Sequence, residues 1–286
     1  MWVAYAAGAA VFAGITAVLA KAGIRHTSSN LATAVRTIAV LVCAWLMAFL
    51  VGSHTSITEL SGRTWLFLVL SGLATGASWL CYFRALQLGE VNKVAAVDKS
   101  SLVLTVLFAI AFLGETENLA TRLLGIALIS VGTYLMVERS TWTTPAAGNR
   151  WLVYALGAAV FAALTAILGK VGITEVESNL GTAIRTGVVL IMAWVVVFVT
   201  GEHRGLPSIP RRDLVFIGLS GVAVGASWLC YWRAMQEGPA SLVAPIDRLS
   251  ILVTVGLAAW LFGERTTRRA AIGLALIVVG TLLMLL

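Results

Sequence analysis

The chain has 286 residues and a formal net charge of +7, yet 59% of its residues are hydrophobic and only 12% are charged. Soluble domains carry roughly 25% charged residues, so this composition excludes an ordinary soluble protein and indicates a polytopic membrane protein. The basic residues lie mostly in short predicted loops without interleaved aromatic side chains. That distribution favours retention of those loops in the cytoplasm over nucleic-acid binding.

Apolar stretches of about 20 residues, long enough to cross a hydrocarbon layer of ~30 Å, recur along the whole chain. In the first half they predict membrane-spanning helices at 2–24, 30–52, 64–88, 94–114 and 118–137. In the second half they predict spans at 151–173, 179–201, 213–236, 241–262 and 267–286. The first stretch lacks a basic leader, so we expect a retained span and not a cleaved signal peptide.

The two halves repeat each other. YAAGAAVFAGITAVLAKAGI (5–24) matches YALGAAVFAALTAILGKVGI (154–173), and the offset stays at 149 from Tyr5 to Glu115. We therefore expect one repeat at 1–137, a polar linker at 138–150 and a second repeat at 151–286. Because five spans return the chain on the side opposite its start, the second repeat must be inverted. The predicted fold is an all-α membrane protein with ten transmembrane helices in two inverted five-helix repeats.

Loop charge predicts the orientation of these spans. One side of the membrane carries most of the basic loop residues, and the other carries few. The basic side holds Lys21, Arg25, Lys93, Arg139, Arg150, Arg204, Arg211, Arg212, Arg265, Arg268 and Arg269, and the other side holds Arg63, Arg122 and Lys170. The positive-inside rule then places both termini outside and the linker in the cytoplasm.

Charged residues also recur at equivalent positions inside the spans or at their edges. They are Arg36 and Arg185, Arg84 and Arg233, Asp98 and Asp247, and Lys99 and Arg248. If all eight faced lipid near the bilayer centre, the cost would be on the order of 20 kcal/mol, at ~2.5 kcal/mol each. These side chains must therefore face protein, water or one another, or lie near the headgroups.

Helical spacing places several polar residues on shared faces. Asp98, Ser101 and Thr105 fall at i, i+3 and i+7, and Asp247, Ser250 and Thr254 repeat the stripe. The predicted substrate-binding residues are Arg36, Arg185, Arg84, Arg233, Asn30, Asn179, Trp79, Trp228, Tyr82, Tyr231, Gln87 and Gln236. The alternative is that the charges are structural ion pairs that lock the helices, and that the aromatic residues serve in packing or as interfacial anchors.

Two other repeated features have local explanations. Gly72-x-x-x-Gly76 and Gly221-x-x-x-Gly225 are typical of close helix contacts. Glu115 and Glu264 begin the loop after the fourth span of each half, where a capping or loop contact is expected.

The motifs SWLCYFRALQLGE (78–90), FLGE (112–115) and LLGIALISVGTYLM (123–136), with their partners in the second half, resemble the EamA domain of the drug/metabolite transporter superfamily. The two copies cover almost the entire chain, and each half also resembles the short, single-domain EamA-like proteins. The resemblance implies ten helices around a central cavity and, in many members, export of metabolites or amino acids. Ten-helix members usually keep both termini in the cytoplasm, whereas loop charge here places them outside.

These features predict a secondary active transporter in the plasma or inner membrane of a bacterium or archaeon. The recurrent charges give six cations against two anions, which favours an anionic or zwitterionic substrate. Asp98 and Asp247 are the candidate proton carriers, and Lys99 and Arg248 are predicted to pair with them or to charge the cavity. A lipid-linked carrier flippase and a non-transporting assembly subunit are the alternatives.

No enzymatic activity is predicted, because HExxH, GxSxG, paired histidines and acidic clusters are missing from the sequence. The three cysteines, Cys43, Cys81 and Cys230, lie in apolar segments without metal-ligand spacing. We therefore expect no metal, cofactor or nucleic-acid partner. The expected partners are a small-molecule substrate and the lipid bilayer, and the protein is expected to act as a monomer.

Overall fold

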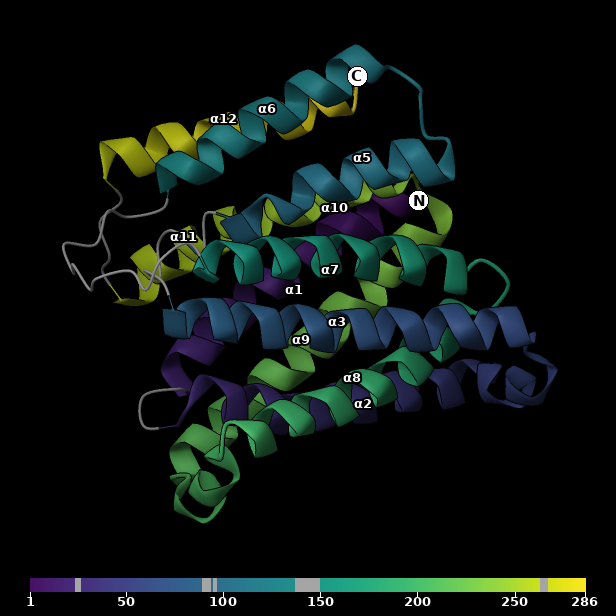
Figure 1. Ribbon diagram of the computed structural model, residues 1–286, viewed down its shortest axis with the longest axis vertical. Helices are drawn as coiled ribbons and strands as arrows, with labels where there is room; N and C mark the ends of the chain where they lie inside the picture. Colours follow the sequence, from purple (N-terminus) through teal and green to yellow (C-terminus); the bar gives the residue numbers. More distant parts are fainter. Residues whose placement is uncertain (24–26, 89–93, 95–96, 137–149, 263–266) are drawn as a thin grey trace.

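The computed structural model describes residues 1–23, 27–88, 94, 97–136, 150–262 and 267–286, and these residues form helices joined by turns (Figure 1). The first half contains α1 (Trp2–Gly23), α2 (Ser29–Val51), the 3-10 helix η1 (Ser53–Glu59), α3 (Gly62–Leu88), α5 (Ser101–Leu113) and α6 (Leu119–Met136). The second half contains α7 (Arg150–Gly172), α8 (Ser178–Val199), η2 (Glu202–Ser208), α9 (Arg211–Glu237), α10 (Ala240–Arg248), α11 (Ser250–Phe262) and α12 (Arg268–Met284).

Eight segments of this described part are long and apolar enough to cross a membrane. They include the continuous apolar segment Ala240–Leu261, which holds α10 and most of α11. α5 and α12, with 13 and 17 residues, are shorter than the spans that the sequence predicted at 94–114 and 267–286. The protein is therefore an all-helical, multi-pass membrane protein.

The predicted span at 241–262 corresponds to the apolar segment Ala240–Leu261, and the structure shows that this segment is divided into two helices. α10 ends at Arg248 and α11 begins at Ser250. The N–H of Leu249 donates to Ile246 O at 2.9 Å, one residue closer than in an α-helix. Pro245 lies one turn before this break, and its carbonyl lies 3.5 Å from Thr281 Oγ1. In the first half, the N–H of Ser100 makes the same short-range bond, to Val97 O at 3.0 Å.

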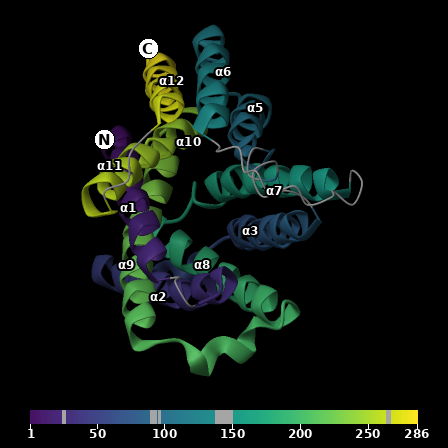
Figure 2. The ribbon, with the colours of Figure 1, turned by 90° about the vertical axis from the view of Figure 1, so that its left-hand side faces the viewer.

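Helices of the two halves pack against each other in matched pairs (Figures 1 and 2). α1 lies on α9 as α7 lies on α3, and the equivalent helices α2 and α8 are in contact, as are α6 and α12. Ser78 Oγ donates to Ala158 O and Ser227 Oγ donates to Ala9 O, each at 2.9 Å. These two bonds are equivalent in the repeats, so the two halves share one packing plan.

Glycines bring these helices close together. A Cβ on Gly72 would lie 2.6 Å from Val188 Cβ, and one on Gly221 would lie 2.7 Å from Ala39 Cβ. The predicted packing role of the two GxxxG motifs is thereby confirmed. In the α6–α12 pair, a Cβ on Gly125 would meet Gly280 O at 2.7 Å, and one on Gly132 would meet Gly273 O at 2.5 Å. The reversed order of these contacts shows that α6 and α12 are antiparallel.

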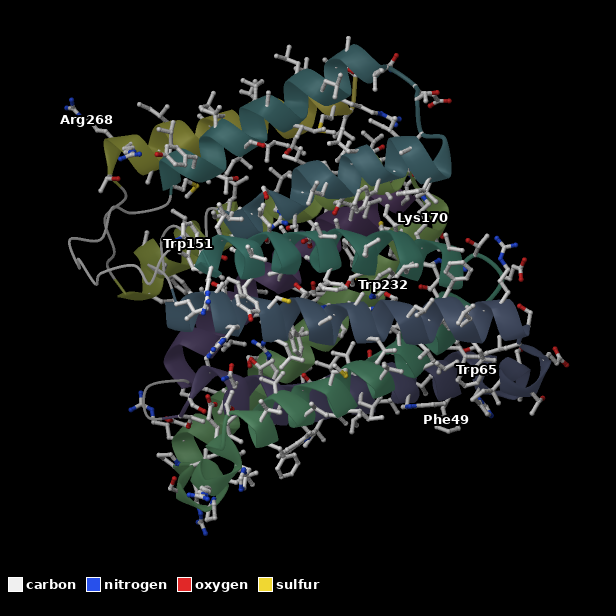
Figure 3. All side chains as sticks on the ribbon, viewed as in Figure 1. Phe49, Trp65, Trp151, Lys170, Trp232 and Arg268 are labelled. Carbon is white, nitrogen blue, oxygen red and sulfur yellow. The ribbon has the colours of Figure 1, made fainter. Side chains whose placement is uncertain are left out.

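Apolar side chains cover both the core and much of the outer surface. The largest buried cluster includes Leu68, Ile173, Leu180, Trp232 and Met235, and it lies where α3, α7, α8 and α9 meet. Figure 3 shows Trp232 within the bundle and Phe49 at its periphery, where 56% of Phe49 is exposed. A surface this apolar fits a lipid environment.

Candidate functional site

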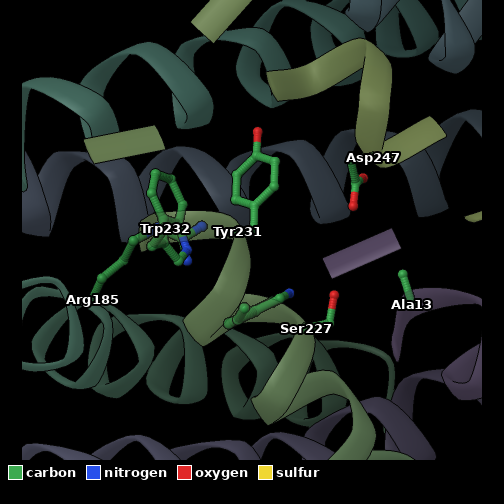
Figure 4. A pocket seen from close by; sticks show the side chains of 7 residues that line it. Ala13, Arg185, Ser227, Tyr231, Trp232 and Asp247 are labelled. Atoms are coloured by element: carbon green, nitrogen blue, oxygen red, sulfur yellow. The ribbon is translucent and has the colours of Figure 1, made fainter. Parts of the chain in front are cut away.

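A cavity of about 240 Å³ lies beside α9, with most of its walls from the second half and Ala13 from the first (Figure 4). It is lined by side chains from α1, α8, α9 and α10, namely Ala13, Arg185, Ser227, Trp228, Tyr231, Trp232 and Asp247. Four of these, Arg185, Trp228, Tyr231 and Asp247, are among the residues predicted to bind substrate or to couple ions. The structure thus brings together part of the set that the sequence singled out.

Arg185 is the most constrained charge in this cavity, with only 3% of its surface exposed. Its Nε donates to Ser71 Oγ and its Nη2 donates to Thr75 Oγ1, each at 2.9 Å. Its Nη1 has no hydrogen-bond partner within the described part of the chain. The guanidinium is therefore held by two hydroxyls, and its buried Nη1 is left without an acceptor among the described residues.

Two indole rings complete the surroundings of this guanidinium. Arg185 Cζ lies 4.4 Å from the Trp232 ring centroid and 5.2 Å from that of Trp228. At these distances the rings attract the cation through their π-electrons while keeping water away from its faces. We call Arg185, Ser71, Thr75, Trp228 and Trp232 the Arg185 site.

Local sequence explains how α3 and α8 come close enough to build the Arg185 site. Glu177 caps α8, because its carboxylate accepts from the backbone N–H of Asn179 at 2.9 Å and of Leu180 at 3.2 Å. Arg185 follows two turns later. Gly72 of α3 packs against this part of α8, where a Cβ would lie 3.2 Å from Arg185 O. Without side-chain bulk at Gly72, the hydroxyls of Ser71 and Thr75 reach the guanidinium.

Asp247 lies at the carboxyl end of α10, directly before the helix break, and it faces the same cavity. Its charge is attracted to those of Arg248 and Lys99, and the same two cations attract Asp98. Arg248 Nη2 also lies 3.5 Å from Ser101 Oγ in the opposite half. The equivalent breaks after residues 98–99 and 247–248 therefore gather two anions and two cations between the halves.

The threonine of each predicted polar stripe forms a hydrogen bond within its own helix. Thr105 Oγ1 donates to Ser101 O at 2.8 Å, and Thr254 Oγ1 donates to Ser250 O at 3.0 Å. Both hydroxyls thus bond to carbonyls of their own helix one turn earlier. Ser101 is buried, as is Thr105.

The equivalent arginine of the first half has different surroundings. Arg36 is half-buried, and its Nη2 lies 3.5 Å from Thr33 Oγ1. Ser220, the equivalent of Ser71, donates to Ile217 O within its own helix at 2.8 Å. Val224 occupies the position equivalent to Thr75. The two hydroxyls that hold Arg185 thus have no counterpart at Arg36.

The arginines near the ends of α3 and α9 lie outside this cavity. Arg233 Nε is 2.7 Å from Glu237 Oε1, and its Nη1 is 3.9 Å from Glu177 Oε1. Arg84 is exposed. Neither is among the side chains that line the cavity around Arg185.

The remaining predicted residues are distributed over several sites. Gln236 Nε2 donates to Ile173 O and Val176 O at 2.7 Å each, and so ties α9 to the α7–α8 turn. Asn179 Nδ2 donates to Glu177 at 2.9 Å, and Asn30 Nδ2 donates to Glu202 at 2.6 Å. The side chain of Gln87 lies outside the described part of the structure.

The first-half aromatic residues lie in apolar clusters of their own. Trp79 packs against the buried residues Leu31, Ala34, Ala193 and Val197. Tyr82 packs against a cluster formed by Ala85, Val94 and Ala155.

Three residues of the Arg185 site were not singled out in the sequence: Ser71, Thr75 and Trp232. Thr75 corresponds to Val224 and Trp232 corresponds to Phe83, so neither recurs in the other half. Ser71 recurs as Ser220, but a single serine in an apolar helix carries no distinctive pattern. The one available signal was helical spacing, since Thr75 follows Ser71 by one turn on the same face.

The membrane-spanning helices, their pairing between halves and a polar cavity in the bundle define a protein of the transporter class. The EamA-like transporter family model matches residues 1–138 and again 149–286. The chain belongs to the EamA-like transporter family.

Known proteins agree with this assignment. Over 135 residues the chain is 47% identical to a Sinorhizobium sp. protein described as "Uncharacterized transporter in cobO 3'region", covering 47% of this chain and 95% of that protein. A solved structure titled "Crystal structure of protein" has a TM-score of 0.76 at 18% identity, covering 98% of this chain and 94% of the other. The first relative supports membership of the family, and the second supports the fold alone.

Proposed function

We propose that the protein is a secondary active transporter that exports a small anionic or zwitterionic metabolite through the cavity at Arg185. The observation that carries the proposal is the geometry of this one guanidinium. It is buried, two hydroxyls fix two of its nitrogens, and its Nη1 has no partner among the described residues. A buried cation that lacks a full set of acceptors is costly, and an anionic ligand supplies the missing acceptor.

The charges and the volume of the cavity indicate which class of substrate it can bind. Arginine binds carboxylates in a fixed, directional geometry, so a carboxylate is the group expected at Nη1. Asp247 supplies an anionic group in the same cavity, where an ammonium group of the substrate would bind. The volume of about 240 Å³ is below the ~300–1,000 Å³ of pockets for drug-sized ligands. A small zwitterion fits these features.

Alternating access between two inverted five-helix repeats is the mechanism we infer for transport. Three features support it: the sequence repeat, the matched pairs α1–α9 and α7–α3, and the antiparallel contact between the equivalent helices α6 and α12. Broken helices at the repeat interface are frequent at the substrate and ion sites of secondary transporters. Here the break at Leu249 directly follows Asp247 and Arg248.

Energy for uphill export is proposed to come from an ion gradient or from exchange, because the sequence has no nucleotide-binding motif. Asp247 lines the cavity, and Asp98 belongs to the same group of interacting charges. We assign proton coupling to these two carboxylates. Location in a bacterial inner membrane is inferred from the bacterial relative. Action as a monomer is proposed because the two repeats of the chain both contribute to the cavity, Ala13 from the first and the other lining residues from the second.

A thermal-shift screen of purified protein tests substrate binding. A ligand that binds only the folded state raises the Tm. The panel contains amino acids, monocarboxylates, dicarboxylates and lipophilic cations at matched ionic strength. We expect stabilisation by members of the first three classes and its loss in Arg185→Gln, with Arg36→Gln as the matched control. Stabilisation by lipophilic cations alone, or equal loss in both variants, would overturn the proposal.

A further inference from the structure

A second group of polar contacts lies at one end of the bundle, away from the Arg185 site. Glu115, in the turn between α5 and α6, accepts hydrogen bonds from the backbone N–H of Ala240 at 2.8 Å and of Ser241 at 2.9 Å. The Ser241 hydroxyl donates to the same carboxylate. Because Ala240 and Ser241 begin α10, a first-half side chain caps a second-half helix.

Further contacts tie Glu115 to two more helices. Lys170, near the end of α7, lies 3.3 Å from Glu115 Oε1 and donates to Gly238 O, just before α10. Arg122 of α6 is 3% exposed, and its Nη1 donates to Glu115 O at 2.7 Å. We call Glu115, Arg122, Lys170, Gly238, Ala240 and Ser241 the Glu115 cluster.

The Glu115 cluster is connected to the Arg185 site through α10. This helix has nine residues, with Ala240 against Glu115 at one end and Asp247 facing the cavity near the other. All nine residues belong to one uninterrupted helix. Whatever holds its first turn therefore also fixes the position of Asp247.

The cluster is accessible from outside the bundle. A pocket of about 480 Å³ is lined by Glu115, Arg122 and Lys170, together with Glu117, Gln236 and Glu237. Burial raises the pKa of the Glu115 carboxyl, but the hydrogen bonds from Ser241 and Ala240 and the charge of Lys170 outweigh this effect, so the net shift is downward. Glu115 is thus ionised at neutral pH, in the state that caps α10 and attracts Lys170.

We propose that the Glu115 cluster is the gate that holds this end of the transporter closed, and that opening the cavity to this side requires Glu115 to release α10 and Lys170. The inference rests on the proposed alternating access. It goes beyond that function by assigning the closing contacts to named residues. The glutamate of the FLGE motif is then a gating and positioning residue that acts through α10, with no contact to the substrate.

Cysteine accessibility tests the gate without any substrate. The reporter is an Ala13→Cys variant, because Ala13 lines the central cavity, in a background where Cys43, Cys81 and Cys230 are replaced by alanine. A membrane-impermeant maleimide is added to right-side-out and to inside-out membrane vesicles. A separate Thr116→Cys variant, at an exposed residue next to Glu115, identifies the side on which the cluster lies.

The expected result is a several-fold faster labelling of the Ala13→Cys reporter from the cluster side in Glu115→Gln, with slower labelling from the opposite side. Lys170→Met removes the ion pair but keeps the cap, and it should shift accessibility in the same direction by less. Glu117→Gln is the matched control, because Glu117 lines the same pocket, is exposed and lies two residues away. It should label like the parent.

Unchanged side preference in folded, monodisperse Glu115→Gln and Lys170→Met proteins would overturn the gate, as would an equal shift in Glu117→Gln. If Glu115→Gln does not fold, Lys170→Met and Ser241→Ala provide the same test. Failure of the gate is separable from failure of the proposed function. Accessibility can stay unchanged while ligand binding at Arg185 persists, and binding can be lost while accessibility still shifts.

Discussion

Arg185 and Arg36 occupy equivalent positions in two copies of nearly the same sequence, but only Arg185 is enclosed. Ser71 and Thr75 each hydrogen-bond Arg185 at 2.9 Å, whereas Arg36 has Thr33 Oγ1 at 3.5 Å. The difference follows above all from Val224 in place of Thr75, and from Ser220, which bonds within its own helix. A duplicated scaffold can therefore keep its packing symmetry while one half alone acquires a constrained binding group.

The largest expected effect separates the two arginines. Arg185→Ala should weaken binding of the best ligand from the metabolite panel by at least about 30-fold, since loss of a desolvated charge partner costs about 2–5 kcal/mol. Arg36→Ala should weaken it by less than about 10-fold. Isothermal titration of both purified variants measures the difference. Equal losses would contradict the asymmetry.

The second prediction compares the equivalent aspartates of the two halves, Asp98 and Asp247. Asp247 shares the cavity with Arg185, so Asp247→Asn should strongly reduce proton-driven transport in proteoliposomes. Substrate exchange should persist, at higher substrate concentration, because the amide no longer attracts the ammonium group. Asp98→Asn should produce the same pattern with a smaller reduction. Joint loss of exchange and folding would indicate a structural ion pair. Undiminished proton-driven transport would remove both aspartates from the mechanism.

Thr75→Val gives the Arg185 site the side chain found at the equivalent position of the other half. It removes the acceptor of Arg185 Nη2, and a hydrogen bond to a charged group contributes about 1.5–3 kcal/mol. We expect about 10-fold weaker binding by the same titration, and recovery in Thr75→Ser, which restores the hydroxyl. No recovery in Thr75→Ser would mean that methyl packing, and not the hydrogen bond, is responsible.

The smallest effect is expected from the reciprocal change, Val224→Thr. A hydroxyl at this position is added near Arg36 and leaves the contacts of Arg185 intact, so affinity should stay within about two-fold of the parent. The thermal-shift assay with the same ligand measures it. A loss comparable to that of Thr75→Val would show that the first-half arginine shares in binding.

Local sequence predicted the helices better than the site. The predicted span at 30–52 is α2 at Ser29–Val51, and the span at 213–236 is α9 at Arg211–Glu237. Such bounds can be predicted because they depend on the hydropathy and turn residues of one continuous stretch of sequence. The break at Leu249 has no comparable local signal, since the same short-range bond forms at Ser100 in a half whose sequence has Ala96 in place of Pro245.

The composition of the Arg185 site depends on contacts between halves. Arg185 was predicted because a charge that recurs in an apolar segment is conspicuous. Its partners Ser71 and Thr75 lie on α3, more than a hundred residues earlier in the chain. Repeat comparison draws attention to residues that occur twice, so a residue that distinguishes the halves, such as Thr75, is not selected by it.

The central claim, that the substrate anion binds at Arg185, is tested most directly by an experimental structure with the best ligand from the panel. The account predicts an anionic group within about 3 Å of Arg185 Nη1, at hydrogen-bonding distance, between the rings of Trp228 and Trp232 and the carboxylate of Asp247. A ligand bound at Arg36, or one that leaves Arg185 Nη1 without contact, would contradict it.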